Sequence, residues 1–290
     1  MRPNARSLSS IDEHLRRVGG ATAELALRFA AEALSDRLPQ GEGLLDDYDE
    51  ERASIYFHFY GLPVLEAAGL LRQDRCAEAL LWARIQICLG MHLRYADDIL
   101  DADVATERLA LIYRRSRAYL AEAQRLLIEA GHSWGPTQEA VYVQFIEYEM
   151  EMAAGLSPHF DTQWRRVSPL CVVPKAYLDT SMSPGFTARF QRYLSWSLAH
   201  ADCADLLIDL GRDRITPITR LAHEIAGTGR LGVPAASMAH QEAKAFLTRS
   251  CPRAGEAAPL WNALIAFLEM AYGVVSEAVD AQGDGPLHVS

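Results

Sequence analysis

Apolar residues recur three and four positions apart along most of the chain, which is the spacing of one face of an α-helix. The segment ATAELALRFAAEALSDRL (21–38) has this spacing, and so does TERLALIYRRSRAYLAEAQRLLIEAG (106–131), which stops at Gly131. TQEAVYVQFIEYEMEMAAG (137–155) is a third predicted helix and stops at Gly155. Because we find no alternating strand pattern of useful length and no internal repeat, the sequence predicts an all-α protein.

Two long segments, 74–101 and 186–213, predict helices that are mostly apolar. In LLWARIQICLGMHLRYA (80–96), Arg84 and Arg94 carry the only charges. A helix that is apolar on every side belongs in the interior of a protein rather than on its surface. We therefore expect the first of these helices to be central and buried.

The rest of the chain adds shorter helices and the breaks between them. Further helical segments are expected at 9–17, 241–250 and 260–279. A loop rich in proline is expected after Gly155, with Pro158, Pro169 and Pro174, and MSPGF (182–186) interrupts the chain before the second long helix. The pattern as a whole predicts a single domain over residues 1–290, built from about ten helices packed around a centre. The ends, 1–10 and 281–290, are expected to be flexible.

The composition is that of a folded protein and excludes some partners. Of the 290 residues, 50% are hydrophobic and 23% charged, which is ample for a large core. The net charge of −10 makes nucleic acid an unexpected partner. We find no apolar run near the N-terminus and no stretch typical of a membrane span, so we expect a cytoplasmic protein without a signal peptide or an integral membrane segment. The five scattered cysteines form no CxxC pair, which favours reduced thiols over a zinc site or a disulfide framework.

The first long helix ends in a cluster of acids, LRYADDILDADV (93–104). Asp97 and Asp101 are four residues apart and share one helix face, with Asp98 beside them. The alternative is a solvated helix end, but the apolar helix before these acids favours a buried position. A buried apolar helix that ends in carboxylates indicates a cation site.

The second long helix ends in a similar way, in LAHADCADLLIDLGRDR (198–214). Asp205, Asp209 and Asp213 follow one another at intervals of four residues on one helix face, and Asp202 lies a turn earlier. Like charges at this spacing repel each other, so an exposed face paired with arginines is the alternative to a metal site. Two such rows facing each other would suit Mg²⁺, which bridges carboxylates to the phosphates of a substrate.

The motif DDILD (97–101) resembles the aspartate-rich DDxxD motif of class I isoprenoid synthases, a superfamily that includes prenyl diphosphate synthases, phytoene synthase and terpene cyclases. The second row has the spacing of the terpene-cyclase metal triad, although only Asp205 matches it in residue type. It also resembles the acid-only motif of the prenyl and phytoene synthases, with Leu206 in place of one Asp. The resemblance covers roughly residues 75–215.

The resemblance implies an all-α bundle around a central cavity, with the two metal motifs on facing helices. It implies a cluster of about three Mg²⁺ ions that holds a prenyl diphosphate substrate. The implied catalytic residues and metal ligands of the first motif are Asp97, Asp98 and Asp101. The implied metal ligands of the second motif are Asp205, Asp209 and Asp213, and Arg212 and Arg214 would bind diphosphate. The residues expected to line the pocket are Tyr60, Leu93, Tyr95, Phe186 and Trp196, although ordinary core packing is the alternative for each aromatic residue.

Several elements of the resemblance are missing. The chain has no Gly-Gly-Lys-Arg near the N-terminus, and only Arg108 follows the first motif where chain-elongating synthases carry an arginine pair. Both absences argue against chain elongation. Where a cyclase has its diphosphate-sensing arginine, this chain has Thr180 and Ser181, so the candidates for that role are Arg165 and Arg166, or Arg189 and Arg192. His92 and His200 lie near the motifs and are expected to be packed side chains rather than bases. We find no Ser-His-Asp arrangement.

The sequence therefore predicts a Mg²⁺-dependent class I terpene cyclase, which ionises an allylic prenyl diphosphate and cyclises the carbocation. A prenyltransferase that works head-to-head or with a non-standard acceptor is one alternative. A non-catalytic partner subunit of a prenyl synthase is another. The oligomeric state stays open, and a homodimer is possible because dimers are common in the family and among soluble proteins.

Overall fold

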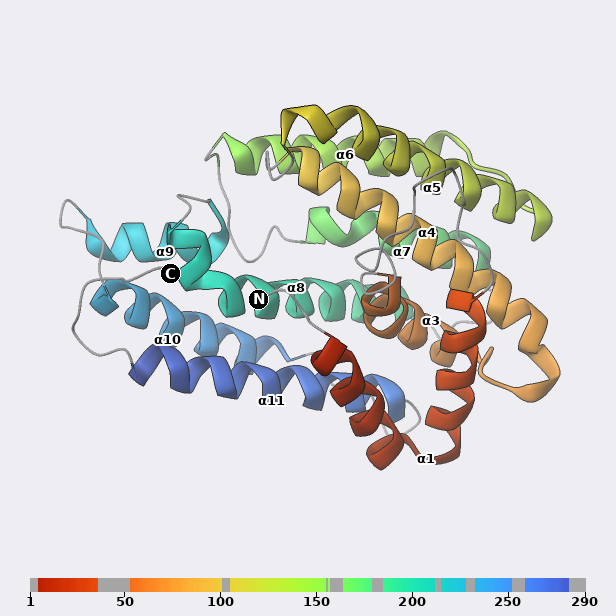
Figure 1. The fold of residues 1–290 in the computed structure, drawn as a ribbon, viewed down its shortest axis with the longest axis horizontal. Helices are drawn as coiled ribbons and strands as arrows, with labels where there is room; N and C mark the ends of the chain where they lie inside the picture. Colours follow the sequence, from red (N-terminus) through yellow and green to blue (C-terminus); the bar gives the residue numbers. More distant parts are fainter. Residues whose placement is uncertain are drawn as a thin grey trace.

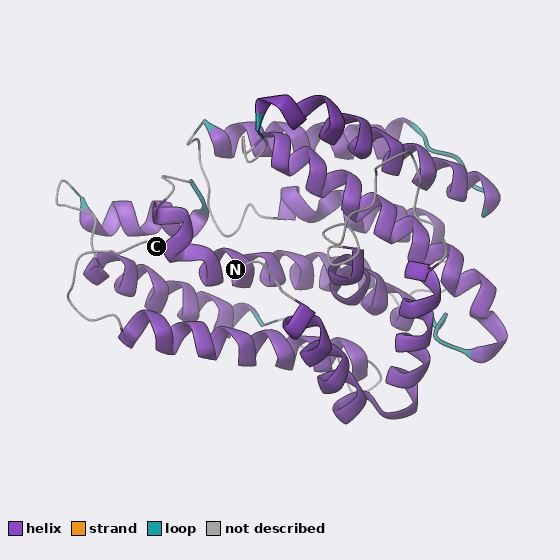
Figure 2. Ribbon diagram, in the orientation of Figure 1, coloured by secondary structure: helices purple, strands orange, loops and turns teal. Residues whose placement is uncertain are grey.

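The computed structural model describes residues 5–35, 53–100, 105–154, 156, 164–178, 185–211, 215–227, 233–251 and 259–281. Helices make up most of these residues, and no strand occurs among them (Figure 2). The prediction of an all-α fold is therefore confirmed. Within the same ranges, none of the helices has the length and the hydrophobicity needed to cross a bilayer.

The described elements are a series of helices and short helical turns. In chain order they are α1 (Ala5–Ser35), η1 (Phe57–Gly61), α3 (Leu62–Ala67), η2 (Gln73–Arg75), α4 (Cys76–Leu100), η3 (Thr106–Arg108), α5 (Leu109–Glu129), α6 (Pro136–Ala153), α7 (Trp164–Leu178), α8 (Phe186–Gly211), α9 (Pro217–Ala226), α10 (Val233–Ser250) and α11 (Pro259–Ala281). The two long helices expected from the sequence are α4 and α8.

Helix α8 runs through the middle of the molecule, with α4, α5 and α6 on one side and α10 and α11 on the other (Figure 1). Helix α7 contacts α4, α6 and α8, so it connects the α4–α6 side to the central helix. Helix α1 packs against both α4 and α11. Buried apolar side chains from most of these helices form one core cluster, which includes the middle of α4 as its sequence predicted.

Helix α7 occupies part of the segment for which the sequence predicted a proline-rich loop. That prediction is wrong for Pro169 and Pro174, which lie inside the helix. A proline in a helix interior costs about 3 kcal/mol. Tertiary packing offsets this cost, because α7 buries apolar side chains that include Val167, Leu170, Cys171, Val173 and Leu178.

The backbone of α7 is also satisfied locally. Proline has no N–H, so Pro169 leaves the carbonyl of Arg165, four residues earlier, without its usual helical donor. The Ser168 hydroxyl donates to this carbonyl at 2.9 Å. The helix therefore passes through Pro169 without an orphaned acceptor at this turn.

A π-helical turn, η1, lies between α1 and α4 and continues directly into α3. Its hydrogen bond runs from the Leu62 N–H to the Phe57 carbonyl, five residues apart. Pro63 comes next and has no N–H for the α-helical bond at that point, which accounts for the wider turn.

Tyr56, the residue just before the π-helical turn, approaches α4 closely at Gly90. A Cβ atom at Gly90 would lie 2.5 Å from Cδ1 of Tyr56, so only glycine leaves room for this ring. Tyr56 packs against Tyr60, with ring centroids 5.2 Å apart. Tyr60 in turn lies within electrostatic reach of Asp97, near the end of α4.

Candidate active site

Asp97 and Asp98 lie in the last turns of α4 and are both only 5% exposed. Arg94, one turn earlier, donates from Nη1 to Asp97 and from Nη2 to Asp98, each at 2.6 Å. The alternative of a solvated helix end is therefore wrong for these two acids. Asp101, the third member of the motif, lies outside the described residues.

The second acidic row lies on α8. Asp202 and Asp209 are buried, and Asp205, on the same face, is partly buried. The alternative of a fully exposed face is wrong for these residues. Asp213 and the two arginines expected to bind diphosphate, Arg212 and Arg214, lie outside the described residues.

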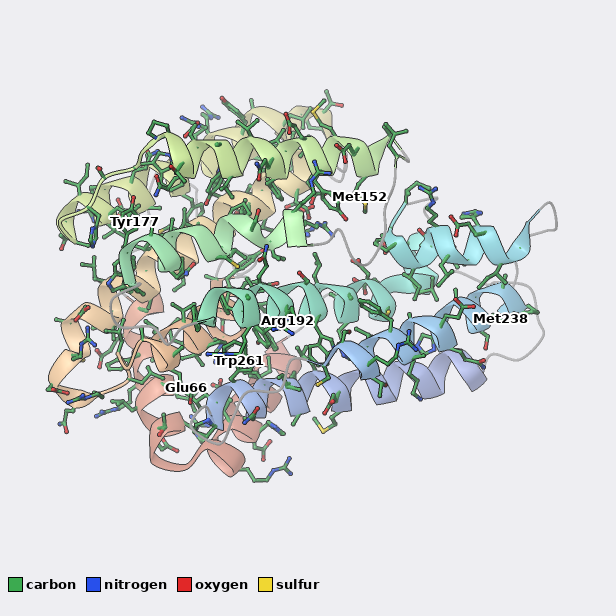
Figure 3. All side chains as sticks on the ribbon, turned by 180° about the vertical axis from the view of Figure 1, so that it is seen from behind. Glu66, Met152, Tyr177, Arg192, Met238 and Trp261 are labelled. Atoms are coloured by element: carbon green, nitrogen blue, oxygen red, sulfur yellow. The ribbon has the colours of Figure 1, made fainter. Side chains whose placement is uncertain are left out.

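Arg166 of α7 connects the two acidic helices. Its Nη2 donates to Asp97 of α4 at 2.7 Å, and its Nη1 lies 3.8 Å from Asp202 of α8. Its Nε forms an ion pair at 2.6 Å with Glu149 of α6. Figure 3 shows α7 lying between α6 and α8, which is the position that lets one side chain reach its neighbours on both sides.

We call these six side chains the acid–arginine cluster: Asp97, Asp98, Glu149 and Asp202 with Arg94 and Arg166. Their formal charges sum to −2. Burial by itself lowers the pKa of a guanidinium, but the carboxylates of Asp97 and Asp98 outweigh this, and the pKa of Arg94 is raised. The cluster is not sealed from solvent, because the side chain of Arg94 is 27% exposed and that of Arg166 16%.

Glu149 was not among the residues predicted from the sequence, although a signal for it was present. Tyr142, Phe145, Glu149 and Met152 follow one another at helical spacing and form the buried stripe of α6. Glu149 is the acid within this otherwise apolar stripe and is 2% exposed. A carboxylate at a core position is expensive unless a cation meets it, so it points to a buried partner.

The structure also separates the candidate arginines. Arg166 belongs to the acid–arginine cluster, whereas its neighbour Arg165 pairs with Glu151 near the surface, at 2.6 Å. Arg189 and Arg192 are exposed on α8. Among the four candidates, Arg166 is therefore the one that contacts the acids of both rows.

Tyr60 is the predicted pocket residue that lies within electrostatic reach of the cluster. Burial is the main cause that raises the pKa of its phenol to about 12. The nearby charges contribute in both directions: Arg166 and Arg94 lower the pKa, while Asp97 and Asp202 raise it. Tyr60 therefore stays protonated at neutral pH and offers a hydroxyl donor rather than a base.

The other predicted pocket residues are buried and pack against neighbouring helices. Leu93 lies one turn before Asp97 on α4. Tyr95 stacks on Tyr119 of α5, and Phe186 meets Trp261 of α11 edge-on. Trp196 donates from its indole N–H to a backbone carbonyl of α10, that of Leu247. These contacts fit core packing, and a role in lining a substrate pocket stays a prediction for each of them.

The two histidines near the motifs are packed side chains. His92 makes contacts through Nδ1 with the Ser116 hydroxyl at 2.8 Å and the Ser116 carbonyl at 3.0 Å, and its ring stacks on Tyr142. His200 lies against Trp196 with ring centroids 4.1 Å apart. Burial lowers the pKa of each histidine to about 4, so both are neutral at physiological pH.

The fold brings together a Ser-His-Asp group that the sequence pattern did not indicate. Ser54, His58 and Asp12 come together, with His58 Nε2 3.0 Å from an Asp12 oxygen and Nδ1 3.3 Å from the Ser54 hydroxyl. Nδ1 also lies 2.6 Å from the Ser54 carbonyl, which can only accept. Nδ1 therefore carries a proton and cannot take one from Ser54, so the group links α1 to the π-helical turn instead of activating a nucleophile.

Within the ranges that the structure describes, no three His, Cys, Asp or Glu side chains converge as a ready metal site. Arg166 lies among Asp97, Glu149 and Asp202. A scan against protein-family models found no match, and searches of curated proteins and of solved structures found none either. The described residues thus define an all-α protein with a buried acid–arginine cluster shared by four helices.

Proposed function

We propose that the chain is a Mg²⁺-dependent class I terpene cyclase, which ionises an allylic prenyl diphosphate and cyclises the resulting carbocation. The observation that carries this proposal is the position of Arg166, whose guanidinium meets Asp97 of α4 and faces Asp202 of α8. The two acidic helices, more than a hundred residues apart in sequence, therefore supply carboxylates to one buried centre. Surface acids placed for solubility have no reason to converge in this way.

The residues of the centre fit magnesium in their chemistry. Carboxylate oxygens are the protein ligands that Mg²⁺ prefers, and Asp97, Asp98 and Asp202 present them from two helices. In the described arrangement, arginines neutralise these acids. Metal binding would therefore replace some of the arginine–carboxylate contacts with metal–carboxylate contacts. Asp101, Asp205, Asp209 and Asp213 complete the proposed ligand set. When bound, Mg²⁺ would act as a Lewis acid that stabilises the leaving diphosphate.

The chain's own groups have distinct roles in this proposal. Arg166, with Arg212 and Arg214, binds and orients the diphosphate through charge-assisted hydrogen bonds. Tyr60, which stays protonated, donates a hydrogen bond at the edge of the same centre. The aromatic residues predicted for the pocket stabilise the cation with their ring faces and exclude the water that would quench it.

A prenyltransferase is the second candidate. The observation that favours it is the residue type of the second row, since Asp202, Asp205 and Asp209 are all carboxylates and share one face of α8. The cyclase triad has a hydroxyl or amide residue within this row. A non-catalytic partner subunit is the third candidate, because the Gly-Gly-Lys-Arg element is missing.

The test is to incubate the purified protein with Mg²⁺ and geranyl, farnesyl or geranylgeranyl diphosphate, each alone and then with isopentenyl diphosphate. Released pyrophosphate and extracted hydrocarbons are measured, with the oligomeric state followed by light scattering. A cyclic product from one allylic diphosphate alone supports the cyclase. Product only after addition of the second substrate supports the prenyltransferase, and no pyrophosphate under any combination favours the partner subunit.

Two variants control this assay. Asp97→Asn removes one charge from the centre and keeps the shape of the side chain, so we expect pyrophosphate release to be lost. Asp74→Asn makes the same change at an exposed acid that pairs with Arg72, and we expect activity to stay at the wild-type level. Equal activity in both variants would contradict the assignment of the site.

A further inference from the structure

We propose that Glu149 is a positioning residue, which holds Nε of Arg166 so that the two terminal nitrogens of the guanidinium face α4 and α8. The inference rests on the proposed function, because its purpose is to present Arg166 to a diphosphate. Glu149 would not touch the substrate, and it would act through Arg166 alone.

The contact distances around Arg166 support this role. The Nε–Glu149 ion pair is the shortest at 2.6 Å, followed by Nη2–Asp97 at 2.7 Å and Nη1–Asp202 at 3.8 Å. A guanidinium is planar and its donors point in fixed directions. The Nε–Glu149 contact is an ion pair rather than an aligned hydrogen bond, so Glu149 holds this edge of the guanidinium by charge. Because the group is rigid, holding one edge beside α6 restricts where both terminal nitrogens can lie.

Burial makes the contact between Glu149 and Arg166 strong. Glu149 is 2% exposed, and the Arg166 side chain is 16% exposed. A carboxylate as deeply buried as Glu149 depends on its guanidinium partner, because removal of the partner would leave a buried charge uncompensated. The pair should consequently hold its geometry while other contacts of Arg166 change.

The contact with Asp202 is the one most open to change. At 3.8 Å it is longer than a hydrogen bond, so Nη1 attracts Asp202 without donating to it directly. A diphosphate oxygen accepts the same N–H groups as a carboxylate oxygen does. We expect Nη1 to turn to diphosphate on binding, while Nε stays with Glu149.

The chain offers a matched control on the same two helices. Arg165 of α7 pairs with Glu151 of α6 at 2.6 Å, but the Glu151 side chain is 41% exposed. Glu149→Gln and Glu151→Gln each remove one carboxylate charge from α6 and one ion pair to α7. They differ in whether the pair lies in the acid–arginine cluster or at the surface.

The first measurement is a ¹H–¹⁵N spectrum of the arginine Nε–H groups in the full chain, with the Arg166 signal assigned from Arg166→Lys. We expect a slowly exchanging Arg166 signal in the wild type that shifts and exchanges fast in Glu149→Gln. In Glu151→Gln it should stay unchanged. An Arg166 signal that is the same in Glu149→Gln and the wild type would overturn the inference, whatever the protein catalyses.

The second measurement is steady-state kinetics with the allylic diphosphate, together with calorimetric binding of inorganic pyrophosphate and Mg²⁺. In Glu149→Gln we expect kcat to fall by about tenfold or more, with a smaller change in KM, and the affinity for pyrophosphate to weaken by about tenfold. Glu149→Asp keeps the charge with a shorter reach, so it should fold even if the glutamine variant does not and should recover part of kcat. Glu151→Gln should stay within about twofold of the wild type.

The outcomes separate this inference from the proposed function. Wild-type kinetics and pyrophosphate affinity in Glu149→Gln would overturn the inference and leave the proposed function intact. A wild-type protein that neither releases nor binds pyrophosphate would overturn the proposed function. In that case Arg166 would have no diphosphate to meet, so that part of the inference would also be overturned. The Nε–H spectrum would still decide whether Glu149 orients Arg166.

Discussion

Gln86 of α4 donates from Nε2 to the backbone carbonyl of Leu170 in α7, at 3.4 Å. This carbonyl is the one that Pro174, four residues later, leaves without a helical N–H donor. A buried side chain on one helix thus replaces the backbone donor missing from another. The contact fixes α7 against α4 one turn beyond Arg166, on the helix that carries the centre of the proposed site.

Replacement of Gln86 should therefore destabilise the protein in a way that depends on Pro174. We expect Gln86→Leu to lower the free energy of unfolding by about 1–2 kcal/mol, because it leaves the Leu170 carbonyl without this donor. In a Pro174→Ala background the backbone N–H returns, and the same substitution should cost about 1 kcal/mol less. Urea denaturation of the four proteins measures the coupling, and equal costs in both backgrounds would contradict the compensation.

Removal of Arg166 should be far more destabilising than removal of Arg165. Arg166→Met leaves Asp97, Glu149 and Asp202 buried without this guanidinium, and the loss of one partner from such a group typically costs about 3–5 kcal/mol. Arg165→Met breaks a pair near the surface and should cost less than about 1 kcal/mol. Chemical denaturation at neutral pH compares the two, and similar losses would mean that the buried contacts of Arg166 are weak.

Acid should destabilise the protein partly through His200. Burial lowers its pKa from 6.5 to about 4, so between these values the unfolded chain binds a proton that the folded protein does not. The stability that depends on neutral His200 is therefore complete above pH 6.5 and is lost as the pH falls toward 4. We expect His200→Gln to remove up to about 3 kcal/mol of this pH dependence. Unfolding free energies at pH 7.5, 5.5 and 4.5 test this, and parallel pH curves for variant and wild type would refute it.

A methyl group at Gly90 should disturb the contact between the π-helical turn and α4. A Cβ atom there would meet the Tyr56 ring at 2.5 and 2.6 Å and its Cβ at 3.0 Å, and atoms so near the backbone cannot easily move aside. We expect Gly90→Ala to lower the unfolding free energy by about 1–3 kcal/mol. Tyr56→Ala should cost less in the Gly90→Ala background than in the wild type, and thermal melts of the set measure this difference. Additive losses would show that the ring is not the obstacle.

Helix periodicity and the burial of individual acids could be predicted from the sequence. The long helices α4 and α8 were expected near their observed bounds, because the 3.6-residue period is a property of the local chain. The apolar residues before Asp97 and Asp98 indicated that these acids are buried, as they are. The same local pattern failed at α7, since proline has a low helix propensity whatever contacts its neighbours make elsewhere in the fold.

The sequence by itself determined which side chains are acidic, which helix faces they share and that the chain is all-α. Only the tertiary structure decided which charges meet. Arg165 and Arg166 are adjacent and chemically identical, yet one pairs with Glu151 near the surface and the other reaches Asp97, 69 residues away. Glu149, likewise, meets Arg166 only because the tertiary structure brings α6 and α7 together. Helical spacing fixes the direction of a side chain relative to its own helix, whereas the partner depends on how α4, α6, α7 and α8 pack, and that packing is set by contacts distant in sequence.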